Sequence, residues 1–236
     1  LRMQLRVPLA ADPDALTERY RTASPFPHVV LDRLFPEDVL QRALAEFPRP
    51  EEIEWRRFES ATEKKLGYWH ETPLPAYLWD LMQAMNAPPM LDFLERLTGI
   101  DGLVPDPYFG GAGPHQILPG GFLKVHVDFN VHPKMRLDRR LNMLIYLNEG
   151  WREEWGGHLE LWDRDVTRCV ERILPAFNRT VVFSTTETSY HGHPHPLACP
   201  PGNSRKSLSF YYYTAGRPEE ERAPAHDTVF RDTPPQ

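Results

Sequence analysis

The sequence predicts a mainly β domain, a barrel or sandwich of short strands, with helices on its N-terminal side. From about residue 107 onward, short apolar or alternating runs are separated by glycine, proline, asparagine or charged turns, a pattern typical of antiparallel strands. The chain of 236 residues also holds 25 prolines, yet only Pro175 lies between Pro133 and Pro194. Because proline cannot donate to a strand ladder, we expect the core of the sheet in this proline-poor stretch.

Three amphipathic helices are expected before the β core. Their ranges are 36–47, 75–86 and 90–97. Apolar residues recur in each at helical spacing, which indicates one buried face. Pro36 suits a first turn, where the missing N–H removes no hydrogen bond, and Gly99 suits the end of the third helix, where glycine adopts the left-handed conformation at little cost. Pro88 and Pro89 are expected to separate the second helix from the third.

The remaining segments complete a single domain in three parts. Residues 1–106 are expected to form a helical and extended layer packed on the core, residues 107–214 the core itself, and residues 215–236 a tail that is a loose strand or loop. Within the first part, residues 25–35 predict an extended segment, and residues 51–74 fit no element. The strands expected in the core are GPHQILPGG, FLKVHVDF, RLNMLIYLN, HLELWD, RTVVFS and KSLSFYYYT.

Composition and charge exclude several classes of protein. With 41% hydrophobic and 25% charged residues, the chain has the composition of neither a disordered nor a fibrous protein, and no apolar stretch approaches the roughly 18 residues of a membrane-spanning helix. A net charge of -6 disfavours a nucleic-acid partner. The first ten residues do not read as a signal peptide, and Cys169 and Cys199 fit neither a metal motif nor a disulfide framework, so we expect a cytoplasmic protein. Nothing in the sequence predicts the oligomeric state.

The first candidate site is the pair His126 and Asp128 in KVHVDFN. Residues two apart on a strand point to the same face, so an imidazole and a carboxylate can be directed at one point. The segment TSYHGHPHPL offers His191, His193 and His195 as a third ligand. Two histidines and one carboxylate on one side of a metal suit non-haem Fe(II), since three positions stay open. Taken alone, however, a histidine beside an aspartate on a strand is more often a structural hydrogen-bonded pair.

A second candidate site lies in NSRKSLSFYYYT. Arg205 and Ser207 are two apart and therefore share one face of the expected strand. An arginine that enters an apolar strand needs an anion, because a buried charge is rare unless it is paired. A guanidinium binds a carboxylate through two parallel hydrogen bonds. The alternative is a surface arginine at the end of a strand.

Taken together and in order, these motifs resemble the 2-oxoglutarate/Fe(II)-dependent oxygenases, and among them the prolyl-hydroxylase-like branch. The segments that carry the resemblance are FLKVHVDFN, RRLNMLIYLN, GGHLELWD, NRTVVFSTTETSYHGHP and SRKSLSFYYYT. They cover roughly residues 107–214, and their joint occurrence is more specific than any one of them. The resemblance implies a double-stranded β-helix, the jelly-roll fold that cupins also have.

The resemblance also implies which residues bind the metal. His126 and Asp128 match the paired ligands of the family, and His191 matches its distal histidine. His193 and His195 remain competitors for that third position. His193 precedes a proline and is expected in a turn, so neither is taken as a ligand.

For the co-substrate, the resemblance points to the other end of the site. Arg205 matches the residue that binds the distal carboxylate of 2-oxoglutarate. Tyr146 matches a tyrosine that shares this carboxylate, and Ser207 is expected to assist. The alternative for Tyr146 is a core tyrosine whose hydroxyl finds some other partner.

These roles imply a dioxygenase that hydroxylates an unactivated C–H bond and releases succinate and CO₂. The implied cofactors are Fe(II), 2-oxoglutarate as co-substrate and O₂, with ascorbate as a stimulant. The expected partner is a small-molecule or peptidyl substrate, such as an amino acid, a peptide or a small metabolite. Two alternatives lack oxygen chemistry: a metal-binding cupin-like isomerase or sugar-binding module, and an interaction domain that kept only the fold.

Overall fold

The β core of the protein is one strongly curled sheet. The computed structural model describes residues 5–69 and 71–234, and all the strand pairs in this part of the chain are antiparallel. The strands are β1 (His28–Asp32), β2 (Arg56–Glu59), β3 (Glu63–Gly67), β4 (Val104–Pro105), β5 (Gly113–Ile117), β6 (Phe122–Val127), β7 (Asp138–Tyr146), β8 (Leu159–Trp162), β9 (Cys169–Ile173), β10 (Arg179–Ser184), β11 (His191–His193), β12 (Arg205–Thr214) and β13 (Val229–Phe230).

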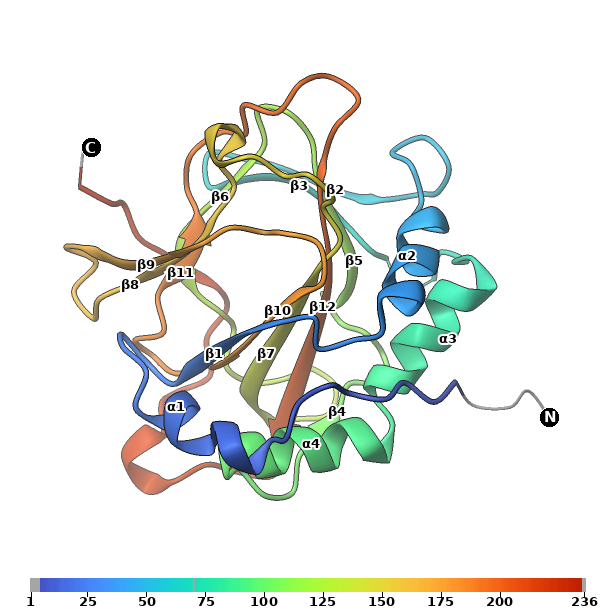
Figure 1. The fold of residues 1–236 in the computed structure, drawn as a ribbon. Helices are drawn as coiled ribbons and strands as arrows, with labels where there is room; N and C mark the ends of the chain where they lie inside the picture. Colours follow the sequence, from blue (N-terminus) through green and yellow to red (C-terminus); the bar gives the residue numbers. More distant parts are fainter. Residues whose placement is uncertain (1–4, 70, 235–236) are drawn as a thin grey trace.

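Hydrogen bonds connect the strands in the order β1-β10-β7-β12-β5-β3-β6-β11-β8-β9. Strand β2 is added beside β3, β4 beside β12, and β13 beside β6. Figure 1 shows how the sheet curls, so that β6 and β11 face the long strands β7 and β12 across the interior. The predicted mainly β architecture with N-terminal helices is therefore confirmed.

The helices all belong to the N-terminal part of the chain. They are α1 (Thr17–Arg21), α2 (Glu37–Ala45), α3 (Ala76–Met85) and α4 (Pro88–Thr98), with short 3₁₀ turns at Asp14–Leu16, Glu153–Trp155 and Glu219–Glu221. The three predicted helices are present, and Pro36 immediately precedes α2. Pro88 and Pro89 form the first turn of α4, where proline is tolerated, and Gly99 ends this helix with a φ of 70°. None of the helices in the described residues has the length and apolar character to cross a membrane.

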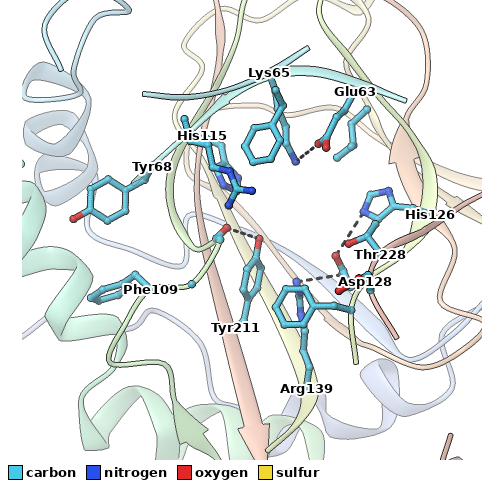
Figure 2. Close-up of a pocket in the computed structure, with 18 of the residues that line it drawn as sticks. Glu63, Lys65, Tyr68, Phe109, His115, His126, Asp128, Arg139, Tyr211 and Thr228 are labelled. Atoms are coloured by element: carbon cyan, nitrogen blue, oxygen red, sulfur yellow. Dashed lines mark hydrogen bonds and ion pairs between the residues drawn. The ribbon is translucent and has the colours of Figure 1, made fainter. Parts of the chain in front are cut away.

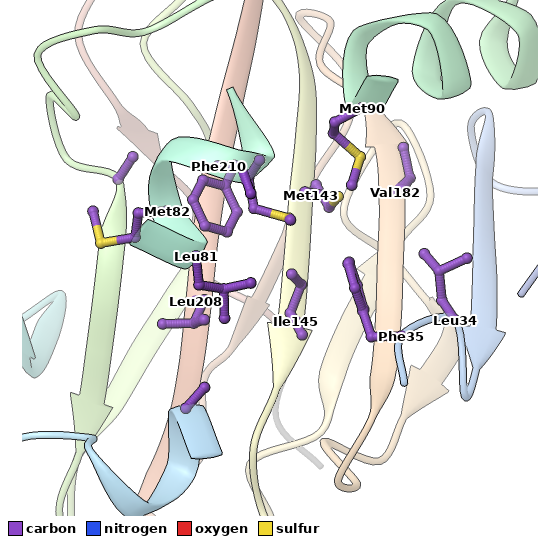
Figure 3. Packing of buried hydrophobic residues seen from close by; sticks show 14 of the residues in the cluster. Leu34, Phe35, Leu81, Met82, Met90, Met143, Ile145, Val182, Leu208 and Phe210 are labelled. Carbon is purple, nitrogen blue, oxygen red and sulfur yellow. The ribbon is translucent and has the colours of Figure 1, made fainter. Parts of the chain in front are cut away.

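The main hydrophobic core fills the space between the helices and one face of the sheet. Figure 3 shows Leu81 of α3 and Met90 of α4 against the strands that carry Met143, Val182 and Phe210. Leu208, Phe210 and Tyr212 of β12 all belong to this core. Because side chains alternate along a strand, the residues between them face the opposite side.

That opposite side is the interior of the curled sheet, and it is polar. Ser207, Ser209 and Tyr211 of β12 line an interior cavity, as do Asn142 and Leu144 of β7. The alternation of β7 and β12 thus separates the helix-packed core from the cavity. The fold places polar side chains in the interior without removing apolar ones from the core.

Two segments without a firm prediction join the sheet. Residues 51–74 contain the hairpin β2–β3, and β3 lies between β5 and β6. In the tail, Val229 and Phe230 pair with Val127 and His126 of β6. The extended segment predicted at 25–35 contains β1, which pairs with β10. The first part of the chain and the tail therefore both add strands to the sheet of the core.

Candidate metal centre

The curled sheet brings His126, Asp128 and His191 together. His126 lies in β6 and Asp128 directly follows this strand, while His191 begins β11 and is the direct partner of His126 in the sheet. One ligand atom from each residue lies within 4.8 Å of the others. Figure 2 shows the His126 imidazole pointing toward the Asp128 carboxylate. Strand pairing between β6 and β11 thus places the third predicted ligand beside the first two.

Hydrogen bonds to the backbone fix which nitrogen of each imidazole faces this cluster. The Nδ1 atom of His126 lies 2.8 Å from the carbonyl of Lys124, and Nδ1 of His191 lies 2.9 Å from the carbonyl of Ser189. A carbonyl only accepts, so each Nδ1 must carry the proton and donate. The Nε2 atoms, which lie 3.6 and 3.5 Å from the carboxylate oxygens of Asp128, are then unprotonated in the neutral rings. This is the tautomer in which a histidine binds a metal through Nε2.

The charge state of the cluster also suits a cation. Burial lowers the pKa of His191 to about 4, assisted by the nearby His126, so the imidazole is neutral at physiological pH. Burial alone would raise the pKa of the Asp128 carboxyl, but the positive charge of Arg139 and the two histidines hold it well below its usual range. Two imidazoles and one carboxylate fit the preference of non-haem Fe(II) for mixed nitrogen and oxygen ligands.

Arg139 is a residue of this centre that the sequence interpretation missed. Its guanidinium lies 3.2 Å from Asp128 Oδ2 and donates to the side-chain oxygen of Asn142 at 2.7 Å. Asn142 in turn donates to Asp128 Oδ2 at 2.8 Å. The guanidinium also stacks on Tyr211, 3.6 Å from the ring centre. Arg139 lies just before the apolar run LNMLIYL. An arginine at the start of an apolar strand is the same signal that identified Arg205, and it could have identified Arg139 as well.

Arg205 lies in the interior on β12 and is 5% exposed. Its Nε donates to the carbonyl of Gly157 at 2.7 Å, and a terminal nitrogen donates to the hydroxyl of Tyr146 at 3.2 Å. Burial lowers the pKa of Arg205, with the Tyr146 hydroxyl opposing this effect. Among the described residues no carboxylate lies within ion-pair distance of its guanidinium. Because a buried cation needs a counter-ion, this arginine fits a bound anion.

Tyr146 and Ser207 lie close to this arginine. They are direct partners in the pairing of β7 with β12, and both are buried. Ser207 lines the same interior cavity as Arg205. The structure therefore brings together the three residues that the sequence interpretation assigned to the co-substrate.

Two neighbouring spaces border the candidate metal ligands. An inner cavity of about 80 Å³ is lined by the three candidate ligands and by Arg205 and Ser207. An outer pocket of about 490 Å³ opens next to it. The residues that line both spaces are Lys65, His115, Leu123, His126, Asp128 and Tyr211. The candidate metal centre consequently lies where a small space meets a larger one.

The outer pocket has an aromatic wall that the sequence did not predict. Phe58 from the β2–β3 hairpin, Phe129 and Tyr211 line it, together with Phe230 from the tail. Phe230 packs on His126 with the ring centres 5.4 Å apart. Figure 2 shows Lys65 and Glu63 on the hairpin side of the pocket, where they form an ion pair of 3.0 Å. Phe58 and the ion pair lie in residues 51–74 and Phe230 lies in the tail, so their place at the pocket is revealed only by the folded chain.

The other two histidines of the HGHPH segment differ in environment. His193 was expected in a turn, but it is the last residue of β11, it is buried, and it lines the inner cavity. Burial lowers its pKa well below the ordinary value, so its imidazole is neutral. His195 is exposed and lies outside both spaces. The turn prediction fails because the strand pairing with β6 continues as far as His193.

Gly192, between the two strand histidines, allows β11 to approach β6 closely. A Cβ atom at this position would lie 2.8 Å from the carbonyl oxygens of both Leu123 and Lys124. The carbonyl of Lys124 is also the one that accepts from His126. A side chain at 192 would therefore push apart the two strands that carry the histidine ligands.

The core of the chain is similar to proteins of a known family. Residues 112–213 match the family described as the 2OG-Fe(II) oxygenase superfamily. Over 79 residues, 32% of this chain, the sequence is 30% identical to prolyl 3-hydroxylase OGFOD1 of Mus musculus. That match spans only 14% of the length of the mouse protein. The resemblance to the 2-oxoglutarate/Fe(II)-dependent oxygenases is thereby confirmed.

Solved structures show the same fold. A Pseudomonas putida prolyl-4-hydroxylase aligns with a TM-score of 0.57 and 21% identity, covering 87% of this chain and 100% of that one. A Trichoplax adhaerens prolyl hydroxylase in complex with a hypoxia inducible factor peptide fragment gives a TM-score of 0.60 at 14% identity, covering 85% and 88%. HygX from Streptomyces hygroscopicus with nickel, 2-oxoglutarate and hygromycin B bound gives 0.57 at 11% identity, covering 92% and 96%. These likenesses confirm the predicted jelly-roll fold.

Proposed function

We propose that this chain is a 2-oxoglutarate- and Fe(II)-dependent dioxygenase that hydroxylates an unactivated C–H bond. The observation that carries the proposal is the lining of the inner cavity, which includes the three candidate metal ligands and a buried arginine. Arg205 has no carboxylate partner among the described residues. A cupin-like metal protein without a dicarboxylate co-substrate would have no need of this buried guanidinium.

His126, Asp128 and His191 would hold the iron. Their Nε2 and carboxylate atoms converge, and the backbone carbonyls of Lys124 and Ser189 keep both imidazoles in the binding tautomer. When bound, Fe(II) supplies the redox chemistry that couples O₂ and the decarboxylation of 2-oxoglutarate to oxidation of a C–H bond, with succinate, CO₂ and the hydroxylated substrate as products. The chain's own contribution is to hold the ligands in place before the metal arrives.

Arg205 would bind the distal carboxylate of 2-oxoglutarate inside the inner cavity. Its planar guanidinium offers paired donors, and the hydroxyl of Tyr146, 3.2 Å from it, can donate to the same carboxylate. Ser207 lies opposite Tyr146 and can add a further donor. Arg205, Tyr146 and Ser207 are all buried, and a low-dielectric surrounding strengthens each of these interactions.

The primary substrate would enter through the outer pocket. Its aromatic wall, formed by Phe58, Phe129, Tyr211 and Phe230, suits an apolar portion that carries the reacting C–H bond. The pocket, of about 490 Å³, has room for an amino-acid side chain within a peptide or for a small metabolite. The similar structures support both classes, since one holds a peptide fragment and another holds hygromycin B.

We also infer a reducing, cytoplasmic location, because Cys169 and Cys199 are both free thiols.

The test is an anaerobic titration of the Fe(II)-loaded protein with 2-oxoglutarate, following the metal-to-ligand charge-transfer band. We expect a saturable band, and then succinate formation in air with ascorbate present. A screen of amino acids, peptides and metabolites would identify the substrate by a mass gain of one oxygen atom. A protein that binds Fe(II) but gives neither band nor succinate would contradict the proposal and favour the cupin-like alternative.

A further inference from the structure

His193 has a buried polar side chain that is neither a candidate metal ligand nor part of a hydrogen bond within the described residues. Its side chain is 4% exposed, and neither ring nitrogen has a hydrogen-bond partner among the described residues. It does not belong to the three residues that could hold a metal ion. Buried polar atoms are nearly always hydrogen-bonded, so an imidazole with two unpaired nitrogens points to a missing partner.

The missing partner lies in the inner cavity. His193 lines this cavity together with Arg205 and Ser207. It follows His191 by two positions on β11, with a shift of register against β6 between them, and both side chains line the cavity. Along the strand it is therefore about 7 Å beyond the metal ligand, at roughly 3.4 Å per residue. That offset is comparable to the length of a five-carbon dicarboxylate whose other end is at the metal.

We propose that His193 is a binding residue for the co-substrate and donates a ring N–H to the distal carboxylate of 2-oxoglutarate, beside Arg205 and Tyr146. This inference rests on the proposed function, because it names a further contact of the same co-substrate. A neutral imidazole has one N–H donor and one acceptor nitrogen, so it can donate to a carboxylate without adding a charge to the cavity. The carboxylate would thus be held from β12, β7 and β11 at once.

The experiment compares two keto acids on three variants. 2-Oxopentanoate has the chain length of 2-oxoglutarate but lacks the distal carboxylate, so it cannot accept the proposed hydrogen bond. The variants are His193→Leu, which removes the donor, His193→Gln, which keeps an N–H donor, and His195→Leu as the matched exposed control. Each Fe(II)-loaded protein is titrated anaerobically with both keto acids, and Fe(II) affinity is measured separately without either.

We expect His193→Leu to lose roughly ten- to a hundredfold in 2-oxoglutarate affinity, as for a hydrogen bond to a charged group. Its affinity for 2-oxopentanoate and for Fe(II) should stay near that of the wild type. His193→Gln should recover part of the loss, and His195→Leu should behave as the wild type.

Three results would overturn the inference. Unchanged 2-oxoglutarate affinity in His193→Leu would mean that ordered water satisfies the imidazole. An equal loss for both keto acids would indicate a packing role, and a loss of Fe(II) affinity would indicate a role at the metal. If the wild-type protein itself binds no 2-oxoglutarate, the proposed function fails and this inference fails with it, a result distinguishable from the other three.

Discussion

Two buried arginines of the candidate site differ in how their charge is balanced: Arg139 lines the outer pocket beside Asp128, and Arg205 lines the inner cavity. Arg139, at the metal end, is 1% exposed and pairs with Asp128 at 3.2 Å. Arg205 is 5% exposed, and its hydrogen bonds to the described residues go to the neutral oxygens of Gly157 and Tyr146. The chain neutralises the first guanidinium itself, whereas the second has no carboxylate partner among the described residues and, in our proposal, receives one from a ligand.

This difference separates an end whose contacts lie within the chain from an end for which we propose a ligand. At the candidate metal end, Asn142 and Arg139 both contact Asp128 Oδ2, and these contacts orient the carboxylate. At the proposed co-substrate end, a bound anion would offset the cost of burying Arg205 without a counter-ion. Substitutions at the two ends should therefore affect different measurements.

The largest effect is expected for the three metal ligands. His126→Ala, Asp128→Ala and His191→Ala should each abolish Fe(II) binding, since each removes one of only three proposed protein ligands. Isothermal titration with Fe(II) under nitrogen measures this directly. His195→Ala is the control and should bind as the wild type. Iron binding retained in His191→Ala but lost in His193→Ala would show that the distal ligand had been assigned to the wrong histidine.

Next in size is the loss of the internal ion pair. Arg139→Met keeps most of the side-chain volume but leaves the Asp128 carboxylate buried without its counter-ion, which typically costs about 3–5 kcal/mol. Denaturant unfolding of the metal-free protein should show a loss of this order, and added Fe(II) should recover part of it. The double variant Arg139→Met with Asp128→Asn should be more stable than the single one.

The matched change at the other end sharpens the contrast. Arg205→Met removes a guanidinium that has no carboxylate partner, so the ligand-free protein should lose far less stability than Arg139→Met does. Equal losses in the two variants would show that the two ends do not differ in charge balance.

For ligand binding, Arg205→Ala should have the larger effect at the co-substrate end. Removing one partner of a buried charge pair typically costs about 2–5 kcal/mol, or roughly thirtyfold to several thousandfold in affinity for 2-oxoglutarate. Arg205→Lys should recover only part, because lysine lacks the planar pair of donors. The charge-transfer titration measures both variants. Affinity like that of the wild type in Arg205→Ala would remove the main support for the oxygenase proposal.

The smallest effect is expected for Tyr146→Phe. It removes one hydroxyl near the proposed carboxylate. One hydrogen bond contributes about 0.5–1.5 kcal/mol, or up to about 3 kcal/mol when it is well made to a charged group, which is roughly two- to a hundredfold in affinity. Fe(II) affinity without co-substrate should not change. If the iron affinity fell more than the 2-oxoglutarate affinity, Tyr146 would belong to the metal end instead.

Local sequence patterns predicted the parts of the site that one strand carries alone. His126 with Asp128, and Arg205 with Ser207, are each two residues apart, and the alternation of a strand places each pair on one face. The helices could be predicted in the same way, because the apolar periodicity of each helix is a local pattern. The resemblance to a family then related segments that no local pattern connects, such as the strand of His126 and the segment that carries His191.

The rest depended on which distant segments pair. The ion pair between Arg139 and Asp128 needs β7 to face the end of β6 across the interior, and no spacing predicts that distance. The placement of His193 depends on how far β11 continues along β6. The contact of Phe230 with His126 comes from a strand of two residues in a tail rich in proline and charge, a composition that normally favours a loop.

The close approach of β11 to β6 at Gly192 limits which residues position 192 can tolerate. In a saturation library selected for Fe(II) binding, position 192 should accept glycine alone, although its residue has no side chain and no chemistry. Any larger residue would meet two carbonyl oxygens at 2.8 Å and would separate β11 from β6. A scan for functional positions would consequently rank this glycine beside the histidines on either side of it, and the reason would be the spacing between two backbones.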